Sequence, residues 1–398
     1  HRCGRGGGGA HRPPEGLRVY VYDLPPRFNS GMLALNMQQC RGSIYSAEVF
    51  IHEQLLVSST LTLNASEADL FFVPWYSSCF MSSNFVKPGP GWPDNDVDIG
   101  KTYLATQAVI DHIKGSHPFW NDSNGADHVW PFTSDWGSCL GPFAELHNSI
   151  HLVTSGDVSE ERPPWYYLRA KDHMGSSPDF AERCRLPCYQ HHKDVAIPPM
   201  LSVPALFRDS RGVGNADRPV RVYFRGNTAG SHKAMPFARN YSMGIRQYIV
   251  DNFSEERGWL VSRENRPESY HKELASSQMC LAPPGWEQWS VRLFESLLLG
   301  CIPVIFSLSL VLPFQSLIDY SNVTLRVRDS ADLAALPALL ASVPGPALDL
   351  KRRSIASMWR AVTYQRPPEE GDAFDLLLRE LSARAPTRGG TPRGGWLS

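Results

Sequence analysis

The sequence carries no surplus of either charge, and it lacks the short motifs that would assign a function at once. Lys and Arg number 39 against 40 Asp and Glu, so no net field is available to hold nucleic acid or an anionic membrane. There is no G-x-S-x-G element of a serine hydrolase and no C-x-x-C pair of a zinc site. An anionic ligand must therefore be met by basic side chains placed locally.

Length and composition indicate a globular protein with two cores. The chain of 398 residues is too long for one ordinary core, and its 42% hydrophobic and 20% charged residues are typical of a folded protein. Apolar runs alternate with helical patterns, which predicts parallel sheets covered by helices. The expected strands are 17–24, 68–75, 127–132, 150–154, 194–197, 220–224, 279–282 and 301–306, and the clearest expected helices are 47–56, 234–253, 270–276 and 288–299.

These elements predict an α/β protein with two doubly wound, Rossmann-like domains that face a cleft. A Pro-, Arg- and Gly-rich stretch at 204–219 has the composition of a hinge. Ligands of such folds bind outside the carboxyl ends of the strands. The predicted divisions are a disordered linker at 1–16, a first domain at 17–205, a second domain at 206–335, closing helices at 336–383 and a disordered tail at 384–398.

Cysteines and glycosylation sequons favour an oxidising compartment. Eight cysteines are present; Cys184 and Cys188 are close enough for a small-loop bridge, and Cys280 with Cys301 can join neighbouring strands. Chance would give about two N-x-S/T sequons at average composition, and the chain has an excess. The five sequons begin at Asn64, Asn121, Asn240, Asn252 and Asn322.

A charge-free stretch at 296–318 is long enough to cross a bilayer. It is interrupted by Gly300, Pro303 and Pro313, so the better interpretation is a helix end, a buried strand and a loop of a soluble domain.

The strongest local unit is a Pro-Gly turn between an expected strand and an expected helix, PPGWEQWSVRLFE at 283–295. Backbone N–H groups at a helix start suit a diphosphate. Arg292 and Glu295 share a face, where the arginine can bind phosphate and the carboxylate can accept ribose hydroxyls. From spacing alone, an i,i+3 salt bridge on a solvated surface is the better interpretation.

A second unit, FRGNTAGSHK at 224–233, runs from an expected strand into a Gly-containing loop that is neither a G-x-G-x-x-G nor a Walker loop. Arg225 and Lys233 are candidate diphosphate ligands there, or ordinary surface charges. In the first domain, Asp127 and Asp135 flank an expected strand. Either carboxylate is a candidate general base, and either can equally cap a turn.

Two patterns resemble metal sites without their usual context. Asp94, Asp96 and Asp98 form D-x-D triplets, but no strand precedes their Gly/Pro-rich loop. His191 and His192 form a pair more typical of a surface than of a ligand set. We therefore expect no metal and no cofactor other than a sugar nucleotide as co-substrate.

Taken together, several segments resemble the exostosin family of glycosyltransferases, in its plant and algal branch, over residues 17–381. They are VYVYDLPPRFN, EADLFFVPWY, FWNDSNGADHVW, SDWGSC, KDVAIPP, CLAPPGWEQWSVRLFESLLLGCIPVIF and LPFQSLIDYS. The resemblance implies a GT-B fold and reverses the surface interpretation above. The donor-binding candidates are then Arg225, Gly226, Lys233, Gly285, Trp286, Ser290, Arg292 and Glu295.

The resemblance also implies an inverting transferase that moves a sugar from a UDP-sugar to a polysaccharide or glycoprotein glycan. It implies a Golgi-lumen location with an N-terminal membrane anchor upstream of this sequence. Two residues depart from many relatives: Ser134 stands where histidine precedes Asp-Trp-Gly, and Asp122 stands at a usually basic position. A silent glycan-binding or partner-stabilising subunit on the same fold is the alternative, and a glycoside hydrolase lacks an identifiable carboxylate pair.

Overall fold

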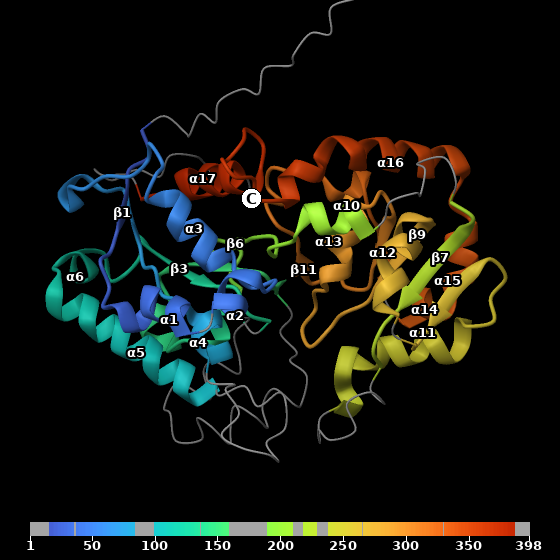
Figure 1. Ribbon diagram of the computed structural model, residues 1–398, viewed down its shortest axis with the longest axis horizontal. Helices are drawn as coiled ribbons and strands as arrows, with labels where there is room; N and C mark the ends of the chain where they lie inside the picture. The colour runs from blue at the N-terminus through green and yellow to red at the C-terminus, as the bar shows by residue number, and fades with distance from the viewer. Residues whose placement is uncertain are drawn as a thin grey trace, which may run out of the picture.

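The computed structural model describes residues 16–35, 37–83, 99–135, 137–158, 189–209, 218–228, 238–264, 266–328 and 330–386. Within them the chain forms two α/β units that lie side by side, each built on a five-stranded sheet (Figure 1). The predicted α/β class with two Rossmann-like domains is confirmed. Residues 1–15, the Asp94–Asp98 loop, Cys184, Cys188, Lys233 and the tail from 387 lie outside the described residues.

The first sheet is parallel throughout and is covered by helices on both faces. Its strands alternate between two cores: Leu70 and Phe72 pack with α3 and α17 on one face, while Phe71 packs with α1, α4, α5 and α6 on the other (Figure 1). The five strands, in sheet order, are β1 (Val19–Val21), β2 (Leu70–Phe72), β3 (His128–Phe132), β4 (Ile150–Val153) and β6 (Val195–Ala196), each within its predicted range.

The helices of this unit connect the strands or close the sheet from the far end of the chain. Predicted helix 47–56 is observed as α3, one residue shorter. The bounds are α1 (Ser30–Leu35), α2 (Met37–Gly42), α3 (Ala47–Leu55), α4 (Ser77–Ser83), α5 (Ile99–Ser116), α6 (Phe119–Ser123), α7 (Phe143–Leu146) and α17 (Ala373–Arg384).

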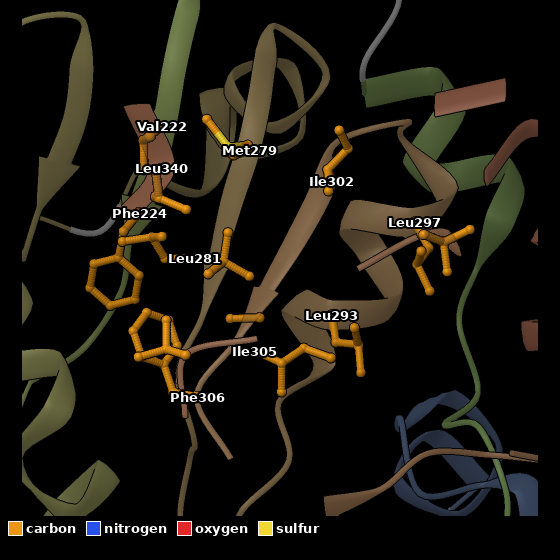
Figure 2. Close-up of a cluster of buried hydrophobic side chains, with 14 of the residues drawn as sticks. Val222, Phe224, Met279, Leu281, Leu293, Leu297, Ile302, Ile305, Phe306 and Leu340 are labelled. Carbon is orange, nitrogen blue, oxygen red and sulfur yellow. The ribbon is translucent and has the colours of Figure 1, made fainter. Parts of the chain in front are cut away.

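The second sheet is also parallel, with its core formed by side chains of its central strands and of the surrounding helices. Figure 2 shows Val222 and Phe224 of β7 beside Met279 and Leu281 of β9, with Leu293 of α13 near Ile305. The strands, in sheet order, are β12 (Leu325–Arg326), β10 (Ile302–Ile305), β9 (Ser277–Ala282), β7 (Val220–Arg225) and β8 (Trp259–Ser262). The edge strands β8 and β12 were not predicted.

Helices surround this sheet as well, and the expected helices from residue 330 onward are present. The bounds are α10 (Val203–Asp209), α11 (Ile245–Phe253), α12 (Pro267–Ala275), α13 (Val291–Leu298), α14 (Ser330–Ala334), α15 (Leu336–Ala341) and α16 (Gly345–Met358). Helix α13 begins at Val291 and not near Gln288, because Gly285 donates its N–H to the carbonyls of Glu287 and Trp289 in a loop.

The strand order of the second sheet contains a reversal. The chain runs from β7 out to the edge strand β8, then returns to β9 on the other side of β7 and continues to β10 and β12. In such sheets the loops after the two strands at the reversal diverge and leave a crevice at their carboxyl ends. The topology therefore points to the loops after β7 and β9 as the ligand-binding edge.

Several contacts fix the two units against each other. The short strand β5 (Gly156–Asp157) of the first unit pairs antiparallel with β11 (Leu310–Val311) of the second. Phe314 is buried in the first unit's core, where α17 also packs after the chain has crossed back (Figure 1). The facing edges of the sheets are therefore held in a defined relation.

Helix α13 ends where the sequence predicts. Gly300 has a left-handed φ of 71°. A Cβ there would lie 2.7 Å from the Arg218 guanidinium, which donates to the carbonyls of Ser277 and Leu299. Glycine suits both the positive φ and the close approach of Arg218. Through its two hydrogen bonds, Arg218 connects the amino end of β9 to the carboxyl end of α13.

Two disulfides lie within the described residues. Cys280 and Cys301 join the neighbouring ends of β9 and β10, as the sequence allows. The Cys40–Cys79 bridge between α2 and α4 was not predicted, and Cys139 is also disulfide-bonded. No described helix has the length and apolar character to cross a bilayer, and the charge-free stretch is divided among α13, β10 and β11.

Peptide mapping of the non-reduced protein should recover Cys40 joined to Cys79 and Cys280 joined to Cys301. Replacing Cys280 and Cys301 together by serine should lower the free energy of unfolding by about 2–4 kcal/mol, because the 21-residue loop between them is then unconstrained. Alkylation of either pair without prior reduction would contradict the assignment.

Candidate functional site

The loop after β7 covers a buried arginine. Arg292, in the first turn of α13, is 7% exposed, and its Nη2 donates to the carbonyl of Arg225 at 2.5 Å. Its guanidinium carbon lies 4.9 Å from the ring centre of Phe224 and 5.9 Å from that of Tyr270. Nε and Nη1 are buried without a hydrogen-bond partner in the described structure. A buried cation with two unpaired nitrogens is costly, and an anion with oxygen acceptors would satisfy it.

Gly226 leaves room for this arginine. A Cβ at residue 226 would lie 2.7 Å from Nη2 of Arg292. The absence of a side chain lets the backbone lie directly over the guanidinium. Sequence reasoning selected Gly226 and Arg292 separately, and the structure brings them into contact.

A second buried arginine, Arg246 in the first turn of α11, donates hydrogen bonds to both the loop after β7 and the loop after β9. Its Nε donates to Pro284 O at 2.9 Å, and its Nη1 donates to the Tyr241 hydroxyl at 2.6 Å and to Asn227 O at 3.4 Å. Burial lowers its pKa to about 10. Sequence reasoning missed Arg246, because an arginine on an amphipathic helix normally lies in solvent and only the fold places these carbonyls around it.

The predicted residues of the Pro-Gly turn lie around these two arginines. The ring of Trp286 lies 4.8 Å from that of Tyr241. Gly285 accepts a hydrogen bond from the N–H of Ser242. Ser290 is the N-cap residue of α13, and its side chain makes no capping hydrogen bond. The positive end of the helix dipole is therefore left for another acceptor beside Arg292.

Arg225 and Glu295 contact side chains on α12 and in the segment before it. Arg225 donates its Nε to Glu273 at 2.7 Å and its Nη1 to Glu264 at 3.4 Å, so its carbonyl, not its guanidinium, meets Arg292. Glu295 accepts from the Tyr270 hydroxyl at 2.7 Å.

Arg292 and Glu295 therefore do not form the surface salt bridge considered from their spacing. Arg292 is buried under the β7 loop, and Glu295 turns to Tyr270 and to His271, whose pKa it raises. Tyr270 connects the two, because its ring lies beneath the guanidinium and its hydroxyl binds the carboxylate. Neither Tyr270 nor its position between them was predicted.

Asp135 follows the carboxyl end of β3 and lies where the two domains meet. The Tyr45 hydroxyl faces its carboxylate, and Arg246 of the second domain is near. The Trp289 indole N–H faces the same carboxylate but does not reach hydrogen-bond geometry. The rings of Tyr45 and Trp289 lie 6.3 Å apart. Burial raises the pKa of Asp135 to about 6.

Asp127, the other candidate base, precedes β3 and lies at the opposite edge of the sheet. It accepts from Ser123 at 2.5 Å and contacts His128 Nδ1 at 2.7 Å. A five-residue strand separates Asp127 from Asp135, which corresponds to roughly 17 Å or more. The expectation that Asp127 faces the cleft does not agree with this position, because the cleft lies at the carboxyl ends. Of the two, only Asp135 faces the second domain.

Among the described residues, no three His, Cys, Asp or Glu side chains lie close enough together to bind a metal ion. The Asp94–Asp98 loop and the donor-site candidate Lys233 lie outside the described residues. Besides Arg246 and Tyr270, sequence reasoning missed Tyr45 and Trp289. Trp289 stands within the PPGWEQWS segment, so a weighting of aromatic residues in that turn would have selected it.

Comparison with known proteins identifies the family of this chain. The Exostosin GT47 domain model matches residues 13–343. A probable glucuronosyltransferase of Oryza sativa subsp. japonica is 32% identical over 93% of this chain and 80% of its own length. A probable glucuronoxylan glucuronosyltransferase of Arabidopsis thaliana is 31% identical over 92% and 72%, and a probable beta-1,4-xylosyltransferase of the same plant is 29% identical over 94% and 83%. The chain belongs to the exostosin GT47 family and is a glycosyltransferase of GT-B-like fold.

Replacing Gly226 by alanine should weaken UDP binding while the protein remains folded. The new Cβ displaces the Arg292 guanidinium, and we expect a cost of about 1–2 kcal/mol, or roughly five- to thirty-fold in affinity. Isothermal titration with UDP measures it. Gly115→Ala on α5 is the control, because a Cβ there meets open space. Wild-type affinity in the Gly226 variant would contradict the close approach.

Proposed function

We propose that this glycosyltransferase transfers a sugar from a UDP-sugar to a polysaccharide or glycan acceptor with inversion at the anomeric carbon. The observation that carries the proposal is the buried Arg292 at the strand-order reversal, where two of its guanidinium nitrogens have no partner among the described residues and the helix start beside them has no side-chain cap. A guanidinium and helix N–H groups together suit the diphosphate of a sugar nucleotide.

Asp135 is the proposed general base. Its carboxylate removes the proton from an acceptor hydroxyl, and that oxygen attacks the anomeric carbon as the bond to the UDP oxygen breaks. Attack from the face opposite the leaving diphosphate inverts the configuration. A carboxyl with a pKa of about 6 is ionised at pH 7 and still a better base than an ordinary aspartate. The rate should therefore fall as pH falls through about 6, where Asp135 becomes protonated.

Transfer is proposed to need no divalent metal. The charge that develops on the departing UDP is met by Arg292 and by the N-terminal dipole of α13, which are in place before the reaction. Within this proposal Glu295 accepts the ribose hydroxyls, since it shares the first turns of the same helix.

A lumenal, N-glycosylated protein is also proposed. The disulfides support an oxidising compartment. The sequon residues Asn64, Asn121, Asn252 and Asn322 are all exposed in the folded protein and thus compatible with attached glycans.

The test is UDP release from a panel of UDP-sugars with xylo-oligosaccharide acceptors, beginning with UDP-glucuronic acid and UDP-xylose because the relatives are named for glucuronosyl and xylosyl transfer. Activity should survive EDTA. Asp135→Asn should bind UDP normally but lose transfer by about 10²-fold or more.

Two outcomes would redirect this account. UDP binding without transfer on the whole panel would favour the silent-subunit alternative. Full loss of activity in EDTA, restored by manganese, would assign the diphosphate to the Asp94–Asp98 loop.

A further inference from the structure

Glu48 is a buried acid that none of the proposed steps uses. It lies in the first turn of α3 and is 1% exposed. Its Oε1 accepts from the backbone N–H of Cys79 at 2.8 Å, and its Oε2 accepts from that of Ser78 at 3.1 Å. The side-chain hydroxyls of Ser77 and Thr133 each lie 3.4 Å from Oε2. One carboxyl therefore contacts the start of α4 and the residue that follows β3.

The hydroxyl protons around Glu48 are already used elsewhere. Ser77 donates to Pro131 O at 3.1 Å, and Thr133 donates to Tyr45 O at 2.6 Å. Ser78 Oγ lies 2.9 Å from Thr133 Oγ1, and since the Thr133 proton is committed, Ser78 is the donor of that pair. No hydroxyl proton remains for Oε2. The contacts of Oε2 with Ser77 and Thr133 are favourable only if Glu48 itself carries a proton to donate.

Thr133 links this cluster to the proposed base. It stands two residues before Asp135, and its hydroxyl donates to the backbone carbonyl of Tyr45, whose own hydroxyl faces Asp135. Tyr45 and Asp135 thus both belong to segments that meet at Glu48.

We propose that Glu48 is a positioning residue, a neutral carboxylic acid that fixes the Tyr45 and Thr133 segments and so holds Asp135 in place for its reaction. The inference rests on the proposed role of Asp135 as base. If Glu48 were ionised, Oε2 would compete with the Tyr45 carbonyl for the proton of Thr133, and the support of Tyr45 would loosen.

The electrostatics agree with this geometry. Burial raises the pKa of Glu48 to about 8 despite the hydrogen bonds that favour its charged form. The other ionisable groups in this region are Tyr76, His52, Glu53 and Arg41. Burial raises the pKa of Tyr76 and lowers that of its partner His52 to about 4, and the pKa of Glu53 is also lowered. None of the three with a shifted pKa titrates between pH 7 and 9, so an alkaline change there belongs to Glu48.

The experiment compares Glu48→Gln, Glu48→Ala and Asp372→Ala. Glutamine keeps one oxygen for the Cys79 N–H and offers an N–H in place of the carboxylic proton, although the Ser78 N–H loses its acceptor. The link to Thr133 is kept, so kcat at pH 7 should stay within about threefold of wild type. Alanine removes the contacts of the Glu48 carboxyl with α4 and Thr133, and kcat should fall about 10- to 100-fold with unchanged UDP affinity.

Asp372 is the matched control, a buried carboxylate at the start of α17 that accepts backbone N–H groups and lies outside the site. Its variant should lose thermal stability but keep kcat.

A pH profile adds a readout that a purely structural role does not affect. Wild-type kcat should fall reversibly above about pH 8 as Glu48 ionises, whereas Glu48→Gln should show no such fall. The folded state raises the pKa of Glu48, so its ionisation opposes folding increasingly between about pH 4.5 and 8. The melting temperature of Glu48→Gln relative to wild type should therefore rise with pH across that range.

A second readout does not depend on turnover. Carbon-13 NMR of the Asp135 carboxyl should show its pKa rising in Glu48→Ala, where the Tyr45 hydroxyl is no longer held beside it, and unchanged in Glu48→Gln. Identical Asp135 titrations in wild type and Glu48→Ala, or an alkaline fall that persists in Glu48→Gln, would overturn the inference. Absence of transfer by the wild-type protein would defeat the proposed function instead, and the NMR titration would still decide whether Glu48 positions Asp135.

Discussion

The buried guanidinium of Arg292 is the constraint on which the second domain's site depends. Gly226 leaves room above it, the rings of Phe224 and Tyr270 lie beside it, and among the described residues the Arg225 carbonyl is its one hydrogen-bond partner. Removing an arginine from water costs several kcal/mol unless its nitrogens are paired, and here two are not. A buried arginine with unpaired nitrogens at a strand-order reversal is typical of a site where a ligand accepts the missing hydrogen bonds.

The first domain contributes a different kind of group, and the connections between the domains determine where it lies. Asp135 stands at the carboxyl edge of a sheet whose position is fixed by the β5–β11 pairing, by Phe314 and by α17. These connections bring Asp135 to Trp289 and Arg246 of the second domain. A basic, hydrogen-bond-donating edge thus faces an edge that carries a carboxylate of raised pKa. That separation of roles is what transfer between a donor and an acceptor requires.

Much of this was readable from the sequence, because eight strands and the Gly300 helix end depend on local patterns. Asp135 was likewise selected from its position after an expected strand, whereas Gly226 and Arg292 were selected as donor-site residues through the family resemblance. Arg246, Tyr45 and Glu48 were not, since each is ordinary in its own segment and acquires its partners only through tertiary packing. Asp127 shows the converse: its sequence context resembled that of Asp135, and only the direction of β3 separates them.

The central claim is that Arg292 marks the nucleotide site, and UDP titration calorimetry of two matched variants tests it most directly. Arg292 and Arg218 are both buried arginines at opposite edges of one sheet, and each contacts a glycine. The account predicts that Arg292→Lys weakens UDP binding by roughly ten- to hundred-fold, about 1.5–3 kcal/mol, because lysine cannot reproduce the planar donors. Arg218→Lys should lower the melting temperature and leave UDP affinity unchanged. Wild-type affinity in Arg292→Lys would contradict the account.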